Sequence, residues 1–292
     1  MHEALAEAVR DGGGDVVPLA DADVLIWADP HAAAAYPEVI AQAPGVRWIQ
    51  LPYAGVEPFV HHLDRDHVWT CGKGVYAPAV AEWVMAALLC ALRDLPRYVR
   101  ETSWSEQTGR NLLGARITTL GGGGIAESLL ELLEPWGTEV TVVRRHDDPV
   151  PGATRTLTGD RRHEAVAGAD AVVVCLALTD QTRGIVDAGL LDAMPRDAWL
   201  INVARGGHVV TDDLIAALDA GTIAGAVLDV TDPEPLPDDS PLWSFDNVVI
   251  TPHVGNTPEM GLPLLATRVK ENVRRWLAGE ELLGLVDVDA GY

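Results

Sequence analysis

Apolar residues occur along the chain in short unbroken runs, and these alternate with longer segments whose apolar residues recur every three or four positions. A run such as AVVVC lacks the polar alternation of a half-exposed strand, which is typical of parallel strands covered by helices on both faces. The alternation predicts the α/β class, with two Rossmann-like or flavodoxin-like domains, parallel sheets and a cleft between the domains. The predicted strands are Asp23–Trp27, Arg47–Leu51, Arg116–Leu120, Glu139–Arg144, Ala171–Cys175, Ala198–Asn202, Ala226–Asp229 and Val248–Thr251. The predicted helices are His2–Arg10, Ala79–Arg100, Ile125–Trp136, Asp212–Ala220 and Pro258–Leu277.

Two domains are expected because 292 residues is about twice the length of a typical domain. We expect a discontinuous substrate (catalytic) domain at residues 1–78 and 266–292, and a dinucleotide-binding domain at residues 79–265. The strand-like segment Leu285–Val288 should return to the first domain. The chain opens in a helical pattern, whereas a domain of this kind normally opens with a strand. Either the first strand has been lost or the sequence starts late, and we favour the late start.

The chain is strongly acidic, with 43 Asp and Glu residues against 21 Lys and Arg residues and a formal net charge of −22. Such a charge argues against binding to nucleic acid or to an anionic membrane. Adaptation to a salty cytoplasm would explain the acidity. Genome composition would explain the excess of arginine over lysine, and the sequence alone does not distinguish these two causes. No apolar stretch has the length of a membrane helix, and the first residues lack the apolar region of a signal peptide, so we expect a cytoplasmic protein. Three cysteines without a C-x-x-C pair argue against a zinc or disulfide framework.

A glycine-rich turn, LGGGGIA, joins a predicted strand to a predicted helix. Interpreted as G-x-G-x-x-A, it places Gly121 at the tight turn, Gly123 where the backbone must approach a pyrophosphate, and Ala126 where the helix packs on the strand. Backbone N–H groups at the start of the helix would bind the anion. We therefore expect a dinucleotide here, with contacts from Gly121, Gly123, Gly124 and Ile125.

The choice between the two nicotinamide cofactors depends on the end of the next predicted strand. NAD sites usually carry an acidic residue there, whereas this chain has Arg144 and Arg145 in VVRRHDD. A guanidinium pair can bind a 2′-phosphate through charge-assisted hydrogen bonds. We therefore expect NADP(H) to be preferred, with NAD(H) possible. The alternative is that the arginines point to solvent and that Asp147 or Asp148 binds the ribose.

Three later segments place an arginine, a glutamate and a histidine at the ends of predicted strands, where open α/β sheets bind their ligands. Arg205 lies in NVARGG, Glu234 in TDPEP and His253 in TPHVG. Reduction of a ketone needs a proton donor, which a histidine supplies when a carboxylate fixes its tautomer and favours its protonated form. An arginine can hold the substrate carboxylate in its planar fork. Singly, each of the three could be structural. The other eight histidines, His208 among them, are interpreted as surface or packing residues.

The chain resembles the D-isomer-specific 2-hydroxyacid dehydrogenase family from about Ala22 to its end, through GGGGIA, NVARGGHV, AGAVLDVTDPEPLP, DSPLW and NVVITPHVG taken together. The subgroup it resembles most is that of the NADP-using glyoxylate and hydroxypyruvate reductases. The resemblance implies that Arg205 orients the substrate, that His253 is the acid/base and that Glu234 is its partner. It also implies that Asp229 contacts the nicotinamide carboxamide. The remaining expected cofactor contacts are Leu176, Ala204 and His253.

Two further loops resemble those that line the substrate cleft in this family. LPYAGV matches the loop whose backbone N–H groups bind the substrate carboxylate, and CGKGVY matches a second loop. The expected substrate contacts are Tyr53, Ala54, Gly55, Gly74 and Arg205. Val80–Trp83 resembles a segment near the family's dimer surface, so a homodimer is implied, although its apolar face would equally suit an ordinary core.

These observations predict an oxidoreductase that reduces a small 2-oxo acid, of the glyoxylate or hydroxypyruvate kind, to the D-2-hydroxy acid by hydride transfer from NAD(P)H. The alternative is a non-catalytic dinucleotide-binding regulatory protein on the same scaffold. The presence of Arg205, Glu234 and His253 together favours the enzyme, because a pure binder has no need of an acid/base pair. The physiological substrate stays open at this point.

Overall fold

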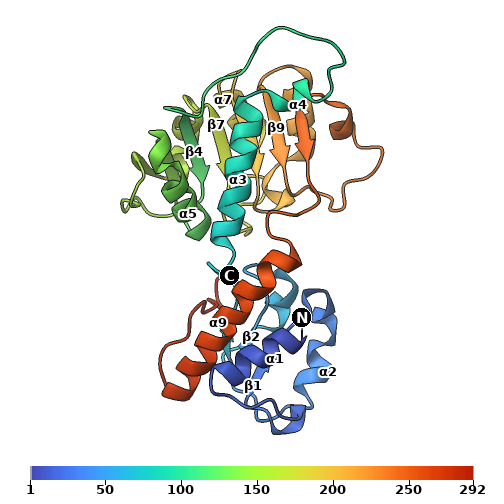
Figure 1. Cartoon of the computed structure of the whole chain (residues 1–292), viewed down its shortest axis with the longest axis vertical. Coiled ribbons are helices and arrows are strands. Elements are labelled where there is room, and N and C mark those ends of the chain that lie inside the picture. Colours follow the sequence, from blue (N-terminus) through green and yellow to red (C-terminus); the bar gives the residue numbers. More distant parts are fainter. Residues whose placement is uncertain (1, 292) are drawn as a thin grey trace. The chain divides into compact units, whose positions relative to one another are not determined.

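The computed structural model describes residues 2–291, apart from the side chains of His2, Pro30 and His31. The chain forms two compact units, coloured by sequence position in Figure 1. Unit 1 comprises the chain up to Tyr76 and from Asn256 onward, and unit 2 is Ala77–Gly255. The expected boundary at 265/266 falls inside helix α9 (Pro258–Ala278), and the structure instead divides the chain before that helix begins.

Unit 2 is built on a seven-stranded parallel sheet in the order β10-β9-β8-β7-β4-β5-β6. Its strands are β4 (Arg116–Leu120), β5 (Glu139–Arg144), β6 (Arg155–Thr158), β7 (Ala171–Val174), β8 (Trp199–Asn202), β9 (Gly225–Leu228) and β10 (Val248–Ile250). The strand order reverses at β4, which lies between β5 and β7. In open α/β sheets, ligands bind at the carboxyl ends of the strands beside such a reversal.

Helices cover both faces of this sheet, and Figure 1 shows α3 lying across one of them. The helices of unit 2 are α3 (Ala77–Leu92), α4 (Leu95–Tyr98), α5 (Gly124–Leu133), α6 (Arg162–Val166), α7 (Ala188–Ala193) and α8 (Thr211–Asp219). Val172 and Val174 of β7 belong to the core under α6, α7 and α8, while Ala171 and Val173 belong to the core under α3 and α5. Alternate side chains thus enter two different cores, which explains why the strand shows no polar alternation.

Unit 1 has a three-stranded parallel sheet in the order β1-β2-β3, formed by β1 (Val24–Ile26), β2 (Trp48–Gln50) and β3 (Val68–Thr70). Its helices are α1 (His2–Asp11), α2 (Tyr36–Ile40) and α9, and α1 packs against α9. Aromatic side chains dominate its core, where the ring of Trp27 lies 5.9 Å from that of Tyr36 and 5.6 Å from that of Phe59. The segment Leu285–Val288 returns to this unit as expected, through a single antiparallel bridge between Thr70 and Leu285.

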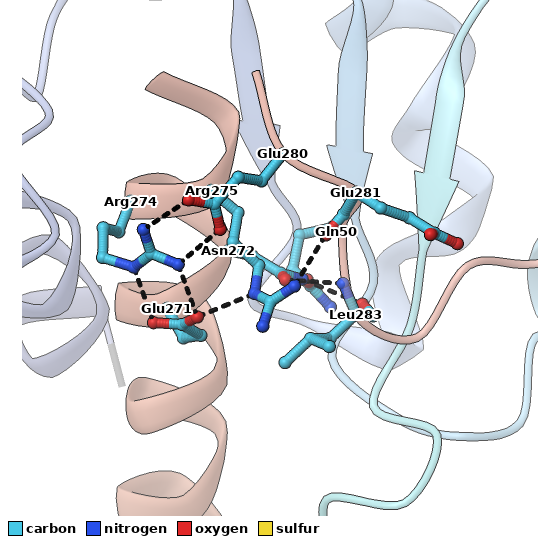
Figure 2. A network of polar contacts seen from close by, with 8 residues as sticks. All are labelled: Gln50, Glu271, Asn272, Arg274, Arg275, Glu280, Glu281 and Leu283. Carbon is cyan, nitrogen blue, oxygen red and sulfur yellow. Dashed lines mark hydrogen bonds and ion pairs between the residues drawn. The ribbon is translucent and has the colours of Figure 1, made fainter. Parts of the chain in front are cut away.

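A buried polar network ties the end of the chain to the sheet of unit 1 (Figure 2). The side chain of Asn272, fully buried in α9, donates to Gln50 Oε1 and to the Leu283 carbonyl, each at 3.0 Å, and accepts from the Leu283 amide at 2.9 Å. These bonds satisfy polar groups that would otherwise be costly to bury. On the exposed side of the helix, Glu271 accepts hydrogen bonds from Arg274 and Arg275.

Most predicted elements are found within three residues of their expected ends, but the short helices α2, α6 and α7 were not predicted, and there are three further differences. The strands β3 and β6 were not predicted, because β3 (VWT) adds only two apolar residues after a polar stretch and β6 (RTLT) has one buried residue of four. The helix expected over Ala79–Arg100 ends at Leu92, and α4 starts after Asp94, whose φ of 55° is left-handed. Among the described residues, no helix combines the length and the apolar character needed to cross a bilayer.

Candidate active site

The glycine turn follows β4 at the strand-order reversal and leads into α5. Gly121 has a φ of +122°, and a Cβ there would come within 2.6 Å of the Cys175 carbonyl oxygen and 2.9 Å of the Leu176 amide. The sheet itself therefore requires glycine at this position, and the same contact places Leu176 beside the turn. Gly123 differs, because a Cβ there would meet no atom within 4 Å. It leaves open space at the N-terminus of α5, which begins at Gly124, and such an end suits a pyrophosphate.

Arg144 is the last residue of β5 and lies beside the glycine turn. A Cβ at Gly122 would come within 3.2 Å of Arg144 Cδ and 3.3 Å of its Cβ, so the arginine stem packs against the turn. Arg144 is half-buried, whereas Arg145, Asp147 and Asp148 are exposed. The helix end and the neighbouring guanidinium fit a dinucleotide that carries an additional phosphate.

The structure brings His253 and Glu234 together at the carboxyl ends of β10 and β9. The imidazole Nδ1 lies 2.8 Å from Glu234 Oε1, and the side chains are 48% and 42% exposed. This contact leaves Nε2 as the ring nitrogen that can face a substrate, because Nδ1 is occupied by the carboxylate. The arrangement can hold a protonated imidazole and deliver its proton.

The turn that carries His253 is fixed by Asp229. His253 has a left-handed φ of 55°, which is uncommon outside glycine. The buried carboxylate of Asp229 accepts hydrogen bonds from the Thr251 hydroxyl and from the amides of Val254 and Gly255, both at 2.8 Å. The backbone carbonyl of Asp229 accepts the His253 amide at 2.8 Å. These four bonds hold the histidine in a conformation that would otherwise be unfavourable.

Arg205 follows β8, the strand next to β9, and its backbone is held from both sides. The Arg205 carbonyl accepts hydrogen bonds from Asn202 Nδ2 at 3.0 Å and from the His208 amide at 3.2 Å, and His208 Nδ1 lies 3.0 Å from it. Asn202 Oδ1 also accepts the Ala204 amide at 3.1 Å. One guanidinium nitrogen of Arg205 donates to the Ala204 carbonyl at 2.8 Å. A half-buried cation on a fixed backbone suits the binding of a carboxylate.

The predicted substrate loops lie together in unit 1, after β2 and β3. The Gly72 amide donates to the Tyr53 carbonyl at 2.8 Å, and the rings of Tyr53 and Tyr76 lie 6.0 Å apart. Burial and the neighbouring Tyr53 raise the pKa of Tyr76, whose hydroxyl donates to the Pro52 carbonyl. Gly74, in the second loop, has a φ of +78°. Ala54 is exposed and Gly55 is half-buried in the first loop.

Several residues at these sites were not singled out from the sequence. His208, interpreted as a surface or packing residue, is fully buried against the Arg205 turn, and Asn202 is fully buried on its other side. Asn256 lines a small hollow in unit 1 with Tyr53 and Tyr76, and its buried Oδ1 has no hydrogen-bond partner among the described residues. The only signal for Asn202 and His208 was their closeness to Arg205 in NVARGGH.

Comparison with known proteins identifies the family of this chain. The profile of the D-isomer specific 2-hydroxyacid dehydrogenase NAD binding domain matches residues 83–255. A glyoxylate/hydroxypyruvate reductase A from Yersinia enterocolitica is 30% identical over 92% of this chain and 87% of its own length.

Two solved structures have the same fold over the whole chain. A D-isomer specific 2-hydroxyacid dehydrogenase from Xanthobacter autotrophicus, in complex with NADPH and MES, is 31% identical with a TM-score of 0.86, and the match covers 96% of that chain. An NADPH-dependent glyoxylate/hydroxypyruvate reductase from Sinorhizobium meliloti, in complex with NADP and sulfate, is 26% identical with a TM-score of 0.84, and the match covers 97% of that chain. The profile, the relative and the two folds agree, and the chain belongs to the D-isomer specific 2-hydroxyacid dehydrogenases, which are NAD(P)-dependent oxidoreductases acting on CH–OH donors.

Proposed function

We propose that this enzyme reduces a small 2-oxo acid, of the glyoxylate or hydroxypyruvate kind, to the D-2-hydroxy acid, with NADP(H) preferred over NAD(H). The observation that carries the proposal is the 2.8 Å contact between His253 Nδ1 and Glu234 Oε1 in the unit that also holds the glycine turn. Unit 2 would be the dinucleotide-binding domain and unit 1 the substrate domain. The relatives from Yersinia and Sinorhizobium carry the reductase name, and the Sinorhizobium structure contains NADP.

Each residue has a role that its chemistry allows. The nicotinamide cofactor supplies a hydride to the carbonyl carbon when it is bound. Arg205 binds the substrate carboxylate and orients the carbonyl, and protonated His253 donates its Nε2 proton to the carbonyl oxygen as the alcohol forms. Glu234 stabilises the imidazolium before that transfer. The proposed cofactor contacts are the glycine-turn residues Gly121, Gly123, Gly124 and Ile125, together with Leu176, Ala204 and Asp229. The proposed substrate contacts are Tyr53, Ala54, Gly55 and Gly74.

The test is oxidation of NADPH, followed by absorbance, with a panel of 2-oxo acids that includes glyoxylate and hydroxypyruvate. We expect turnover with small members of the panel. His253→Ala should lower kcat by roughly a hundredfold or more, because general acid catalysis contributes about 10²–10⁴ in rate, and should leave NADPH affinity nearly unchanged. Tight NADPH binding without turnover of any panel member would instead support a regulatory dinucleotide-binding protein.

The low charge of α3 and the exposed apolar side chains after α4 favour a homodimer. Within α3, Glu82 is the one charged residue among 16, although 22% of the whole chain is charged. In the segment after α4, Val99 is 77% exposed and Trp104 is 96% exposed. Helices poor in charge and large exposed apolar side chains are both typical of protein interfaces. Light scattering coupled to gel filtration should give twice the chain mass, and Trp104→Glu should shift it towards the monomer. A monomeric parent protein would contradict the dimer.

A further inference from the structure

The segment that carries Glu234 is held by few bonds. Residues 230–236 make no backbone–backbone hydrogen bond within the part of the chain that the structure describes. Two threonine hydroxyls bind carbonyls of the segment instead. Thr231 Oγ1 donates to the Pro233 carbonyl at 2.8 Å, which is a bond inside the segment. Thr211 Oγ1 donates to the Asp232 carbonyl at 2.8 Å, and Thr211 is the first residue of α8.

The same segment touches the Arg205 turn. A Cβ at Gly206 would overlap the carbonyl of Thr231 and approach the Asp232 amide to 2.5 Å, so the two backbones are in direct contact. Gly206 therefore packs against the Thr231–Asp232 peptide, and Thr211 donates a hydrogen bond to the Asp232 carbonyl. Since the side chain of Glu234 is 42% exposed, packing does little to fix its direction, and the backbone must do so.

We propose that Thr211 is a positioning residue for the Glu234–His253 pair. Its hydroxyl donates a hydrogen bond to the Asp232 carbonyl. This bond fixes the backbone that leads through Pro233 to Glu234, so that the Glu234 side chain points towards His253. The proposal rests on the proposed function, in which that pair stores and delivers the proton. It assigns to α8 a role in catalysis that acts through Glu234 and involves no contact with the substrate.

Two variants separate the hydroxyl from the shape of the side chain. Thr211→Val removes the donor and keeps the volume, while Thr211→Ser keeps the donor. Thr267→Val is the matched control, because Thr267 Oγ1 makes a comparable bond to the Pro263 carbonyl, at 3.0 Å, in α9 of unit 1. We expect Thr211→Val to lower kcat by roughly three- to tenfold, the effect of one hydrogen bond, with the Kd for NADPH unchanged. Thr211→Ser should restore most of the rate, and Thr267→Val should behave like the parent protein.

A double-mutant cycle tests whether Thr211 acts through Glu234. In a Glu234→Gln background, Thr211→Val should cost little further rate, since the carboxylate it positions is already gone. The same fold loss in both backgrounds, or an unaltered kcat in Thr211→Val, would overturn the positioning role. If the parent protein turns over no 2-oxo acid, or if His253→Ala keeps full activity, the proposed function fails and this inference fails with it. A strong loss in His253→Ala together with a normal Thr211→Val overturns the inference alone.

Discussion

Glu234 and His253 are 19 residues apart in the sequence, yet Glu234 Oε1 lies 2.8 Å from His253 Nδ1. They meet because β9 and β10 are neighbours in the parallel sheet, so the segments that follow these strands leave the same edge. Asp229, the residue directly after β9, reinforces the meeting by accepting two amides from the turn after β10. The acid/base geometry is therefore set by sheet topology and by one buried carboxylate.

The first prediction separates two glycines of the same turn. Gly123→Ala should fold normally, because its φ of −95° is ordinary and its Cβ would meet nothing within 4 Å. It should nevertheless weaken NADPH binding by about tenfold or more, as a methyl group would occupy the space that we assign to the pyrophosphate. Gly121→Ala is the contrasting variant and should lower the unfolding temperature, because its φ is left-handed and its Cβ would press on the Cys175 carbonyl. Thermal unfolding and NADPH titration check both, and normal binding by Gly123→Ala would contradict the site.

The second prediction concerns cofactor choice. Catalytic efficiency should be roughly tenfold to a hundredfold higher with NADPH than with NADH, because a hydrogen bond to a charged group contributes about 1.5–3 kcal/mol. Replacing Arg144 and Arg145 together by alanine should abolish that preference, and added salt should narrow it. Arg155→Ala is the control, since Arg155 lies on the neighbouring strand β6 and pairs with Glu164. Equal efficiencies in the parent protein at low salt would point to Asp147 or Asp148 as the ribose contact.

The third prediction is a pH dependence of stability at α9. Hydrogen bonds from Arg274 and Arg275 lower the pKa of Glu271 from its ordinary 4.5 to about 2. A lowered pKa stabilises the folded state fully above the ordinary value, and that stabilisation is lost as the pH falls towards 2. Glu271→Gln should therefore lower the unfolding temperature at neutral pH, and the difference from the parent protein should shrink below about pH 4.5. The control is Glu259→Gln, in the first turn of the same helix. A difference that does not vary with pH would contradict the prediction.

The fourth prediction follows from the net charge of −22. Mutual repulsion of surface carboxylates destabilises a compact chain, and salt screens it. The unfolding temperature should rise by roughly 5 °C or more between about 0.1 M and about 2 M KCl near neutral pH. At about pH 5, where some carboxylates have become protonated, the rise should be smaller. An equal rise at both pH values would indicate a general effect of salt on hydrophobic burial.

The sequence by itself determined the α/β class, the position of the glycine turn and the three segments that carry Arg205, Glu234 and His253. It could do so because strands covered on both faces show as apolar runs, and because ligand-binding residues follow such strands directly. The strand β3 (VWT) adds only two apolar residues after a polar stretch and β6 (RTLT) contains only one, so neither shows such a run and neither could be predicted.

Only the tertiary structure decided how the site is held. It placed Asp229 under the His253 turn, His208 and Asn202 around the Arg205 carbonyl, and Thr211 on the segment of Glu234. It also distinguished Gly121, which the sheet requires, from Gly123, which leaves space for a ligand. These relationships join residues that no periodicity links. They depend on which strands are neighbours and on how closely two backbones approach, and a linear pattern of apolar and polar residues contains neither quantity.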